Sequence, residues 1–294
     1  MNVSMMDSYN LAWKLAHSIN GLTPLATSGV ADPILETFEP ERADTARQLI
    51  EFDTTFSHIF SGKIGSGNSA TSGLTHEDFL RVFREGSGFT SGCGLHYQPS
   101  RLVRMPVEPQ LKLPATDDLL GGALVPGRRL LNVELKRYAD ATTRQLQDGT
   151  YRSLSCQQPV LELTSITELP STGRYRIIVL ASIDFLDKLG LSQSALLSCI
   201  DAMRRFPAGT IDLAVLHPLE TRFEWTDIPP GVKETAEMRT YGLSRKEDAY
   251  DIYGVSKSDG IIAVVRPDGY IGTLASLSGT GEVEAYLRSC LALV

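Results

Sequence analysis

The strongest constraint on the fold is the alternation of buried strands and helices in the second half of the chain. Short runs of apolar, often β-branched residues predict strands that are covered on both faces. Apolar positions between and after these runs recur with the period of a helix. The predicted elements are a strand at 175–181, a helix at 192–206, a strand at 211–216, a hairpin of strands at 261–266 and 270–274 that turns at Pro267-Asp268-Gly269, and a helix at 281–291.

The order of these elements is that of a thioredoxin-like fold, which is a mixed sheet with helices on its faces. A thioredoxin-like enzyme needs a low-pKa thiolate with a second thiol beside it. The strand ending at Ala181 is followed by Ser182-Ile183-Asp184-Phe185, without a cysteine, and the four cysteines of the chain lie far apart. Disulfide exchange is therefore excluded. Asp184 and Asp187 could form a pair of catalytic carboxylates, but we favour the interpretation that they cap and solvate a helix start.

The first sixty residues predict two helices. Apolar residues between positions 5 and 19 recur with a helical period, and Gly21 marks the expected end of this helix. A second helix is expected over residues 32–58 with Asp32 as its cap, and Pro40 should interrupt it or divide it in two. By themselves these patterns favour two helices that pack against each other.

Charged and flexible segments follow the start of the second helix. Glu39, Glu41 and Arg42 are expected to form helix-surface or interdomain ion pairs that each contribute little. Residues 61–73 are rich in glycine and serine and predict a loop or linker. They are a weak candidate for a phosphate-binding loop, because no strand precedes them and no Gly-Lys-Ser/Thr is present. Prolines between 99 and 114 predict an extended connection between domains.

Composition excludes several classes of function. The formal net charge is −7 and the sequence pI is about 5.3, which argues against a nucleic-acid partner. No window approaches the roughly 18 apolar residues that cross a bilayer, and the N-terminus lacks the features of a secretory signal. The cysteines and histidines show no metal-ligand spacing. The sequence therefore predicts no metal site and a reduced, cytoplasmic protein.

Local runs along nearly the whole chain resemble one family, and their joint order is far more specific than any single run. The matching runs are Met1-Asn2 with Ser4-Met5-Met6-Asp7; Asp7-x-Tyr9-Asn10-Leu11-x-Trp13-Lys14-Leu15; Glu41-Arg42; Phe56-Ser57; Phe60-Ser61-Gly62; Ser91-Gly92; residues 173–179; Tyr253-Gly254; and residues 264–270. In this order they resemble the phenol 2-monooxygenases, or phenol hydroxylases, of fungi and bacteria. The first of these helices resembles the one that begins against the flavin ring in that family.

The resemblance implies an α/β protein in two parts. Residues 1–95 would be the C-terminal helices of an FAD-dependent monooxygenase domain, and residues 96–294 a thioredoxin-like domain that forms dimers. The resemblance also implies FAD as cofactor, NADPH as reductant, and O₂-dependent ortho-hydroxylation of a phenolic substrate in the intact enzyme. In this family the thioredoxin-like domain lacks redox cysteines, as it does here.

The resemblance also implies a contact between the first residues and the flavin. Met1 and Asn2 match the end of the family's Gly-x-Gly-Met-Asn helix start, where backbone amides face the negatively charged edge of the reduced flavin. The alternative is that Asn2 only caps a surface helix. We assign no catalytic residue, because the family's G-x-G-x-x-G motif and its phenol-activating residues have no counterpart in this sequence.

Two functional hypotheses follow. In the first, the chain is the C-terminal portion of a phenol-type hydroxylase from a truncated or split gene, and it is not expected to hold FAD or to act alone. In the second, it is a non-catalytic interaction protein that forms a homodimer or associates with an FAD-domain polypeptide. In both, the helices of residues 5–60 should leave apolar surface for a partner to cover. Neither nucleic acid nor a membrane is expected as a partner.

Overall fold

The computed structural model describes residues 2–24, 32–60, 86, 94–107, 123–138, 144–145, 151–152, 164–165, 173–219, 227–228, 230, 239–244 and 246–294. The helices within these residues are α1 (Asn2–Ile19), the 3₁₀ helix η1 (Leu35–Thr37), α2 (Phe38–Phe60), α4 (Leu191–Met203), α6 (Ala249–Tyr253) and α7 (Thr280–Cys290). The strands are β1 (Glu134–Tyr138), β2 (Arg144–Gln145), β3 (Tyr151–Arg152), β4 (Thr164–Ser165), β5 (Tyr175–Leu180), β6 (Ile211–His217), β7 (Thr240–Leu243), β8 (Ile261–Val265) and β9 (Ile271–Ala275).

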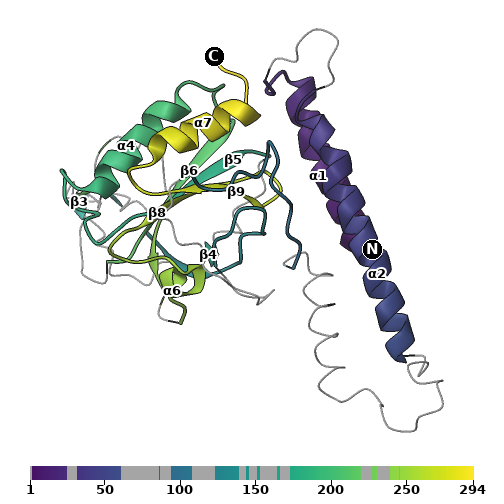
Figure 1. The fold of residues 1–294 in the computed structure, drawn as a ribbon. Coiled ribbons are helices and arrows are strands. Elements are labelled where there is room, and N and C mark those ends of the chain that lie inside the picture. Colours follow the sequence, from purple (N-terminus) through teal and green to yellow (C-terminus); the bar gives the residue numbers. More distant parts are fainter. Residues whose placement is uncertain are drawn as a thin grey trace.

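A seven-stranded mixed sheet forms the body of the second half of the chain (Figure 1). Its strand order is β4-β1-β7-β6-β5-β8-β9. Strands β5, β6 and β7 run parallel, whereas β8 is antiparallel to both β5 and β9. A parallel β5-α4-β6 unit followed by the β8–β9 hairpin and α7 is the thioredoxin-like arrangement, so the expected fold is confirmed, with element ends shifted by a few residues.

The two faces of the sheet explain why its central strands are apolar throughout. Successive side chains of a strand point to opposite faces. In β5, Tyr175, Ile177 and Val179 belong to the core cluster that contains the inner faces of α4 and α7. Ile178 and Leu180 belong to a second cluster on the opposite face, with the aromatic side chains of α6. Because both faces are covered, neither can carry the polar residues of a half-exposed strand.

Helix α7 packs closely on β9 because Gly272 leaves space for a tyrosine. A Cβ atom on Gly272 would lie 1.9 Å from the Tyr286 hydroxyl oxygen. That hydroxyl is fully buried and donates a hydrogen bond of 2.9 Å to the carbonyl of Leu102. The glycine therefore lets α7 fix the irregular segment of residues 94–107 against the sheet.

Helices α1 and α2 lie side by side and run antiparallel next to this body (Figure 1). Gly21 adopts a φ of +66° just after α1, as its expected role at the helix end requires. Asp32 accepts hydrogen bonds from the backbone N–H groups of Ile34 and Leu35, so it caps η1 rather than α2. The helix expected over residues 32–58 is divided in two, into η1 and α2, but the division lies before Pro40. Pro40 is the third residue of α2, where its missing N–H group would have no intrahelical partner.

Two further expectations are only partly within the described residues. The glycine- and serine-rich segment 61–73 lies outside them. Residues 99–107 of the proline-containing connection are described and are irregular, as expected. Among the described helices, none combines the length and the hydropathy that crossing a bilayer requires.

Candidate functional site

Helix α1 turns a mostly polar face toward the sheet and an apolar face outward. Asn10, Lys14 and His17 are buried together with Trp13. Met5 and Ile19, by contrast, are 62% and 81% exposed. The helical period expected from the apolar residues is confirmed, but most of those residues do not pack inward.

The buried polar face of α1 belongs to a group of four charged side chains, which we call the ionic cluster: Lys14, Glu41, Arg266 and Asp268. Lys14 comes from α1, Glu41 from α2, and Arg266 and Asp268 from the β8–β9 turn. None of these side chains is more than 4% exposed. The two cations balance the two carboxylates, which is the condition under which charges can be buried.

Arg266 lies at the centre of the cluster. Its Nη1 and Nη2 atoms donate to the two carboxylate oxygens of Glu41 at 2.6 and 2.9 Å. Its Nε and Nη2 atoms donate to the two oxygens of Asp268 at 3.0 and 2.6 Å. The guanidinium carbon also lies 5.0 Å from the centre of the Tyr97 ring. Planar bidentate pairs of this kind are specific to arginine, so a lysine could not replace Arg266.

Side chains of α1 complete the hydrogen bonding of the two carboxylates. The Asn10 side-chain amide donates to Glu41 at 2.9 Å and to Asp268 at 3.2 Å. The Trp13 indole N–H donates to Asp268 at 3.2 Å, and Lys14 Nζ donates to Glu41 at 2.9 Å. Each carboxylate therefore receives hydrogen bonds from both halves of the chain.

Burial and pairing act differently on the members of the cluster. Burial alone would raise the pKa of Glu41, but Arg266, Lys14 and Asn10 hold it at about 2. Burial lowers the pKa of Lys14 to about 8, because Glu41 only partly offsets desolvation and Arg266 repels the ammonium group. Burial would also lower the pKa of Arg266, but Asp268 and Glu41 raise it well above its ordinary value.

A second ion pair borders the cluster. The Arg42 guanidinium donates to the carboxylate of Asp7 and, at 2.8 Å, to the hydroxyl of Tyr97. Arg42 is 5% exposed, whereas Glu39 lies on the exposed side of α2. Of the two alternatives expected for Glu39, Glu41 and Arg42, a pair between the two halves of the chain is confirmed for Glu41, which pairs with Arg266. Arg42 is also buried, but its ion pair with Asp7 joins α1 and α2.

Three contacts extend the attachment of α1 along its length. Burial lowers the pKa of His17, and its Nε2 atom lies 2.7 Å from the carbonyl oxygen of Gly173. A neutral imidazole protonated at Nε2 makes this hydrogen bond. Trp13 meets Tyr175 of β5 edge to face, with ring centres 6.0 Å apart. Tyr9 donates a hydrogen bond of 3.0 Å to the carbonyl of Pro267.

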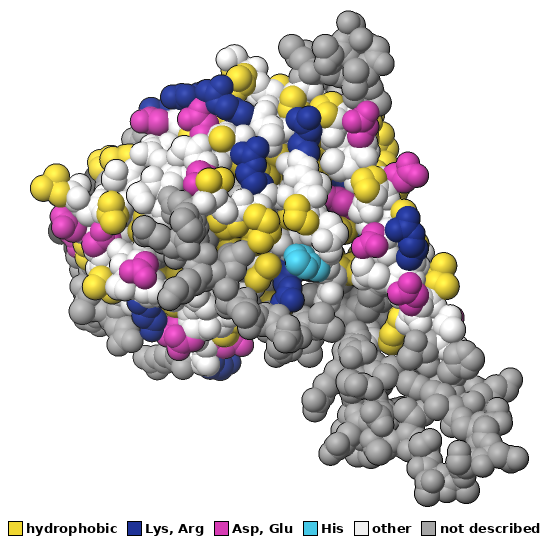
Figure 2. Space-filling view, in the orientation of Figure 1, with side chains coloured by type: hydrophobic (Ala, Val, Ile, Leu, Met, Phe, Trp, Pro, Cys, Tyr) yellow, Lys and Arg dark blue, Asp and Glu magenta, His cyan; other side chains and the backbone are white. Residues whose placement is uncertain are grey.

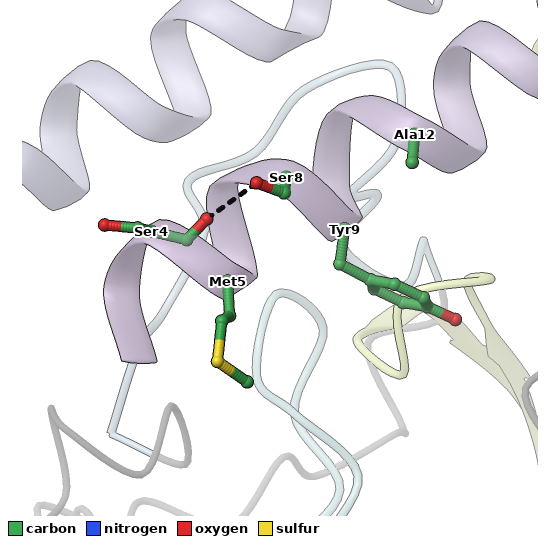
Figure 3. Close-up of a pocket in the computed structure, with 5 residues that line it drawn as sticks. All are labelled: Ser4, Met5, Ser8, Tyr9 and Ala12. Carbon is green, nitrogen blue, oxygen red and sulfur yellow. Dashed lines mark hydrogen bonds between the residues drawn. The ribbon is translucent and has the colours of Figure 1, made fainter. Parts of the chain in front are cut away.

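The outward face of α1 holds a shallow, open depression. Ser4, Met5, Ser8, Tyr9 and Ala12 line it, and Figure 3 shows these side chains along one side of the helix. Ser8 donates a hydrogen bond to the carbonyl of Ser4, and the Tyr9 ring extends toward the β8–β9 turn (Figure 3). The lining combines the apolar groups of Met5, Ala12 and the Tyr9 ring with three hydroxyl groups and no charge. Elsewhere the visible face of the molecule carries acidic and basic side chains mixed with apolar ones (Figure 2).

The predicted cofactor contacts lie at the beginning of α1. Met1 lies outside the described residues, and Asn2 is the first residue of the helix, without a described side chain. The first turn contains no acidic residue.

Asp184 accepts a hydrogen bond from the backbone N–H of Ser192 near the start of α4, which supports its interpretation as a helix cap. No cluster of potential metal ligands occurs among the residues that the structure describes.

Sequence reasoning missed the ionic cluster, although a signal was present. Asp7, Asn10, Lys14 and His17 recur with the same helical period as the apolar residues. A polar stripe at that period marks either a solvated face or a face with buried partners. Its partners Arg266 and Asp268 belong to a turn that we interpreted only as a hairpin connection.

Two family models match the chain. The model of the phenol hydroxylase C-terminal dimerisation domain matches residues 159–293, and a model of an FAD binding domain matches residues 1–53. The ionic cluster joins the two matched regions, since it takes Lys14 and Glu41 from one and Arg266 and Asp268 from the other.

Curated relatives match almost the whole chain. The flavin-dependent oxygenase ucdD of Aspergillus ustus is 30% identical over 98% of this chain and 40% of its own length. The phenol 2-monooxygenase fsqG of Aspergillus fumigatus is 25% identical over 96% of the chain and 43% of its own length. The 3-hydroxybenzoate 4-monooxygenase of Comamonas testosteroni is 26% identical over 98% of the chain and 43% of its own length. The chain thus spans less than half the length of these relatives.

A solved structure has the same fold. Aklavinone-11 hydroxylase in complex with FAD and aklavinone aligns with a TM-score of 0.51 at 15% identity. The alignment covers 98% of this chain and 39% of that protein.

Proposed function

Because the chain belongs to the phenol hydroxylase family of FAD-dependent monooxygenases, we propose that it supplies one wall of a flavin site and the dimerisation domain of an aromatic hydroxylase. The observation that carries this proposal is the ionic cluster, which fixes the helix of the FAD-binding match against the dimerisation domain. In this proposal residues 1–95 are the C-terminal helices of the FAD-dependent monooxygenase domain, and residues 96–294 are the thioredoxin-like dimerisation domain.

The start of α1 suits the negatively charged edge of a reduced flavin. A helix N-terminus carries roughly half a positive charge, and its first N–H groups have no partner within the helix. No acidic side chain in the first turn opposes this charge. The next carboxylate along α1, that of Asp7, is paired with Arg42. These features support backbone contacts from Met1 and Asn2 to the flavin, and they leave Ser4 and Tyr9 on the neighbouring open face.

The flavin, when bound, would supply the oxygen chemistry, with NADPH as the reductant. The overall reaction takes a phenol, O₂, NADPH and a proton to the ortho-diphenol, NADP⁺ and water. The residues of this chain would orient the flavin edge and exclude water from one side of it. We assign no catalytic acid or base to them. The phenolic substrate is inferred from the family.

A second candidate function is a non-catalytic assembly protein. It is favoured by the outward apolar face of α1. Such a protein would dimerise or bind an FAD-domain polypeptide without itself contributing to hydroxylation. The two candidates differ in whether this chain itself contacts the flavin, so a charge placed at the start of α1 should lower the FAD content of the protein and its natural partners only in the first.

Flavin content tests the proposal directly. The tagged protein is isolated with its natural partners from its native cells, and FAD is released by denaturation and quantified. We expect FAD in proportion to the chain, and NADPH oxidation that depends on an added phenol. A flavin-free protein in every preparation would support the assembly function instead.

Two substitutions locate the contact. Ser4→Asp places a negative charge in the first turn of α1, which stabilises the helix but repels the flavin edge. We expect it to lower the FAD content several-fold at unchanged protein yield. Ser8→Asp is the matched control, because Ser8 is also exposed but lies one turn further from the helix start. Equal FAD content in the two variants would contradict the contact.

A further inference from the structure

The loop that joins β5 to α4 exposes a group of large apolar side chains. Within residues 182–190, which we call the β5–α4 loop, Ile183 is 63% exposed and Leu189 is 96% exposed. Leu191, the first residue of α4, is 59% exposed. Leu189 is the most exposed large apolar side chain among the described residues. Several exposed apolar side chains within one short segment mark an interaction site more often than a single exposed leucine does.

The β5–α4 loop holds these side chains in place through its own hydrogen bonds. The N–H groups of Asp187 and Gly190 donate to the carbonyls of Asp184 and Asp187 at 2.8 and 3.0 Å. The N–H of Leu189 donates to the Asp187 carboxylate at 3.0 Å. A Cβ on Gly190 would lie 2.6 Å from the Asp184 carboxylate, so the turn is closely packed. A side chain on such a preorganised turn loses little conformational entropy when a partner covers it.

The position of the loop separates it from the proposed flavin site. Strand β5 begins beside α1, where His17 contacts Gly173, and it runs away from that helix. The loop at its far end therefore lies on the side of the sheet opposite α1 and α2 (Figure 1).

Other described surfaces of the dimerisation match are less suited to close association. The outer face of α7 carries Glu284, which pairs with Arg288 and Arg205 at 2.6 Å each. Burying this group would require desolvation of three charges. The central strands β5, β6 and β8 are buried almost completely. Leu197 on α4 and Leu293 are exposed singly, whereas the β5–α4 loop and the first residue of α4 expose several large apolar side chains close together in the sequence.

We propose that the β5–α4 loop is the surface through which two copies of this chain associate, with Leu189 at the centre of the contact. This inference rests on the proposed function, in which residues 159–293 form a dimerisation domain. A two-fold contact uses the same surface on both copies. The exposed, adjacent Asp187 and Lys188 suit such a contact, because Asp187 of one copy can face Lys188 of the other.

Sedimentation equilibrium of the full chain over a range of concentrations tests this surface. We expect the wild type to dimerise and Leu189→Asp to weaken the dimer at least about tenfold, because a charge would enter the apolar centre of the contact. Ile19→Asp is the matched control: Ile19 is 81% exposed but lies on α1, outside the dimerisation match. It should dimerise like the wild type. Far-ultraviolet circular dichroism spectra should be the same for all three proteins, which shows that each variant is folded.

A cysteine at the centre of a two-fold contact should lie near the same cysteine of the second copy, so that the two can form a disulfide. Leu189→Cys treated with diamide should give a covalent dimer, and Ile19→Cys and the wild type should not. The inference is overturned if Leu189→Asp dimerises like the wild type, if only Ile19→Asp dissociates, or if the wild type stays monomeric at every concentration. None of these results would change the flavin content. The proposed flavin contact is therefore tested independently, by the FAD content of Ser4→Asp and Ser8→Asp.

Discussion

Replacement of Glu41 by glutamine tests the ionic cluster with a minimal change of shape. Glutamine keeps the size of the side chain and one carbonyl oxygen, but it removes the negative charge that faces Arg266 and Lys14. Its amide nitrogen would also face the guanidinium or ammonium donors. The variant therefore leaves a buried excess of positive charge at the contact between α1, α2 and the β8–β9 turn.

The size of the effect follows from the pKa of Glu41. The cluster lowers this pKa from 4.5 to about 2, which corresponds to about 3 kcal/mol at about 1.36 kcal/mol per pH unit. Removing one partner of a buried ion pair costs about 3–5 kcal/mol in other proteins, which agrees. We therefore expect Glu41→Gln to lower the free energy of unfolding by about 3 kcal/mol near neutral pH.

Urea unfolding followed by far-ultraviolet circular dichroism measures this difference. The folded-state pKa lies below the unfolded one, so the stabilisation is complete above about pH 4.5 and is lost as the pH falls toward about 2. The wild type and Glu41→Gln should therefore converge as the solution is acidified. Glu39→Gln is the matched control on the exposed side of α2, and it should cost a few tenths of a kcal/mol at most.

A small effect would refute this reasoning. If Glu41→Gln and Glu39→Gln differ by less than about 1 kcal/mol near neutral pH, then Glu41 is not held as a buried, paired carboxylate. A difference that does not change between neutral and acidic pH would exclude ionisation of Glu41 as its cause.

The remaining predictions concern another member of the cluster and two glycines. Lys14→Met should cost far less than Glu41→Gln, because burial already lowers the pKa of Lys14 to about 8 and Glu41 keeps Arg266. Since the unfolded chain binds the Lys14 proton more tightly, wild-type stability should rise from about pH 8 toward 10.5, and urea midpoints of Lys14→Met should lack this rise. Gly272→Ala should destabilise by about 3 kcal/mol, because its Cβ would overlap the Tyr286 hydroxyl. Gly281→Ala in α7 meets no atom within 4 Å and should instead stabilise by about 0.5–1 kcal/mol, and thermal melts compare the two.

The strands of the sheet could be predicted because their burial shows directly in the residues of each strand. Residues 175–180 and 211–217 are covered on both faces, and this produces apolar runs that need no knowledge of neighbouring strands. The hairpin turn was equally local, since proline and glycine restrict its backbone directly. The ends of elements moved by a few residues because caps and first turns depend on individual hydrogen bonds, such as those of Asp32.

The inward face of α1 could not be predicted, because it depends on residues far away in the sequence. Lys14 and Glu41 are 27 residues apart, and Glu41 and Arg266 are 225 apart. A polar stripe with a helical period looks the same whether it meets water or two carboxylates. The resemblance identified Lys14 and the run 264–270 as matching positions, but it contained no information on which side chains meet.

The exposed apolar residues of the β5–α4 loop posed a similar difficulty. Leu189 and Leu191 lie next to a helix start, and local pattern alone does not separate a leucine that enters the core from one that leaves it. The difference is set by the turns at Asp184, Asp187 and Gly190, whose hydrogen bonds direct Leu189 outward.

The charges of the ionic cluster divide evenly between the two halves of the chain. Lys14 and Glu41 form a neutral pair within the helices, and Arg266 forms a bidentate pair with Asp268 within the β8–β9 turn. Contact between the halves therefore transfers no net charge into the interface. It adds the bidentate Arg266–Glu41 contact and the Asn10 and Trp13 hydrogen bonds, all of which require one relative position of the two halves. Because neither half presents an unpaired charge of the cluster to the other, we infer that this arrangement fixes the orientation of α1 more than it adds to the strength of the contact.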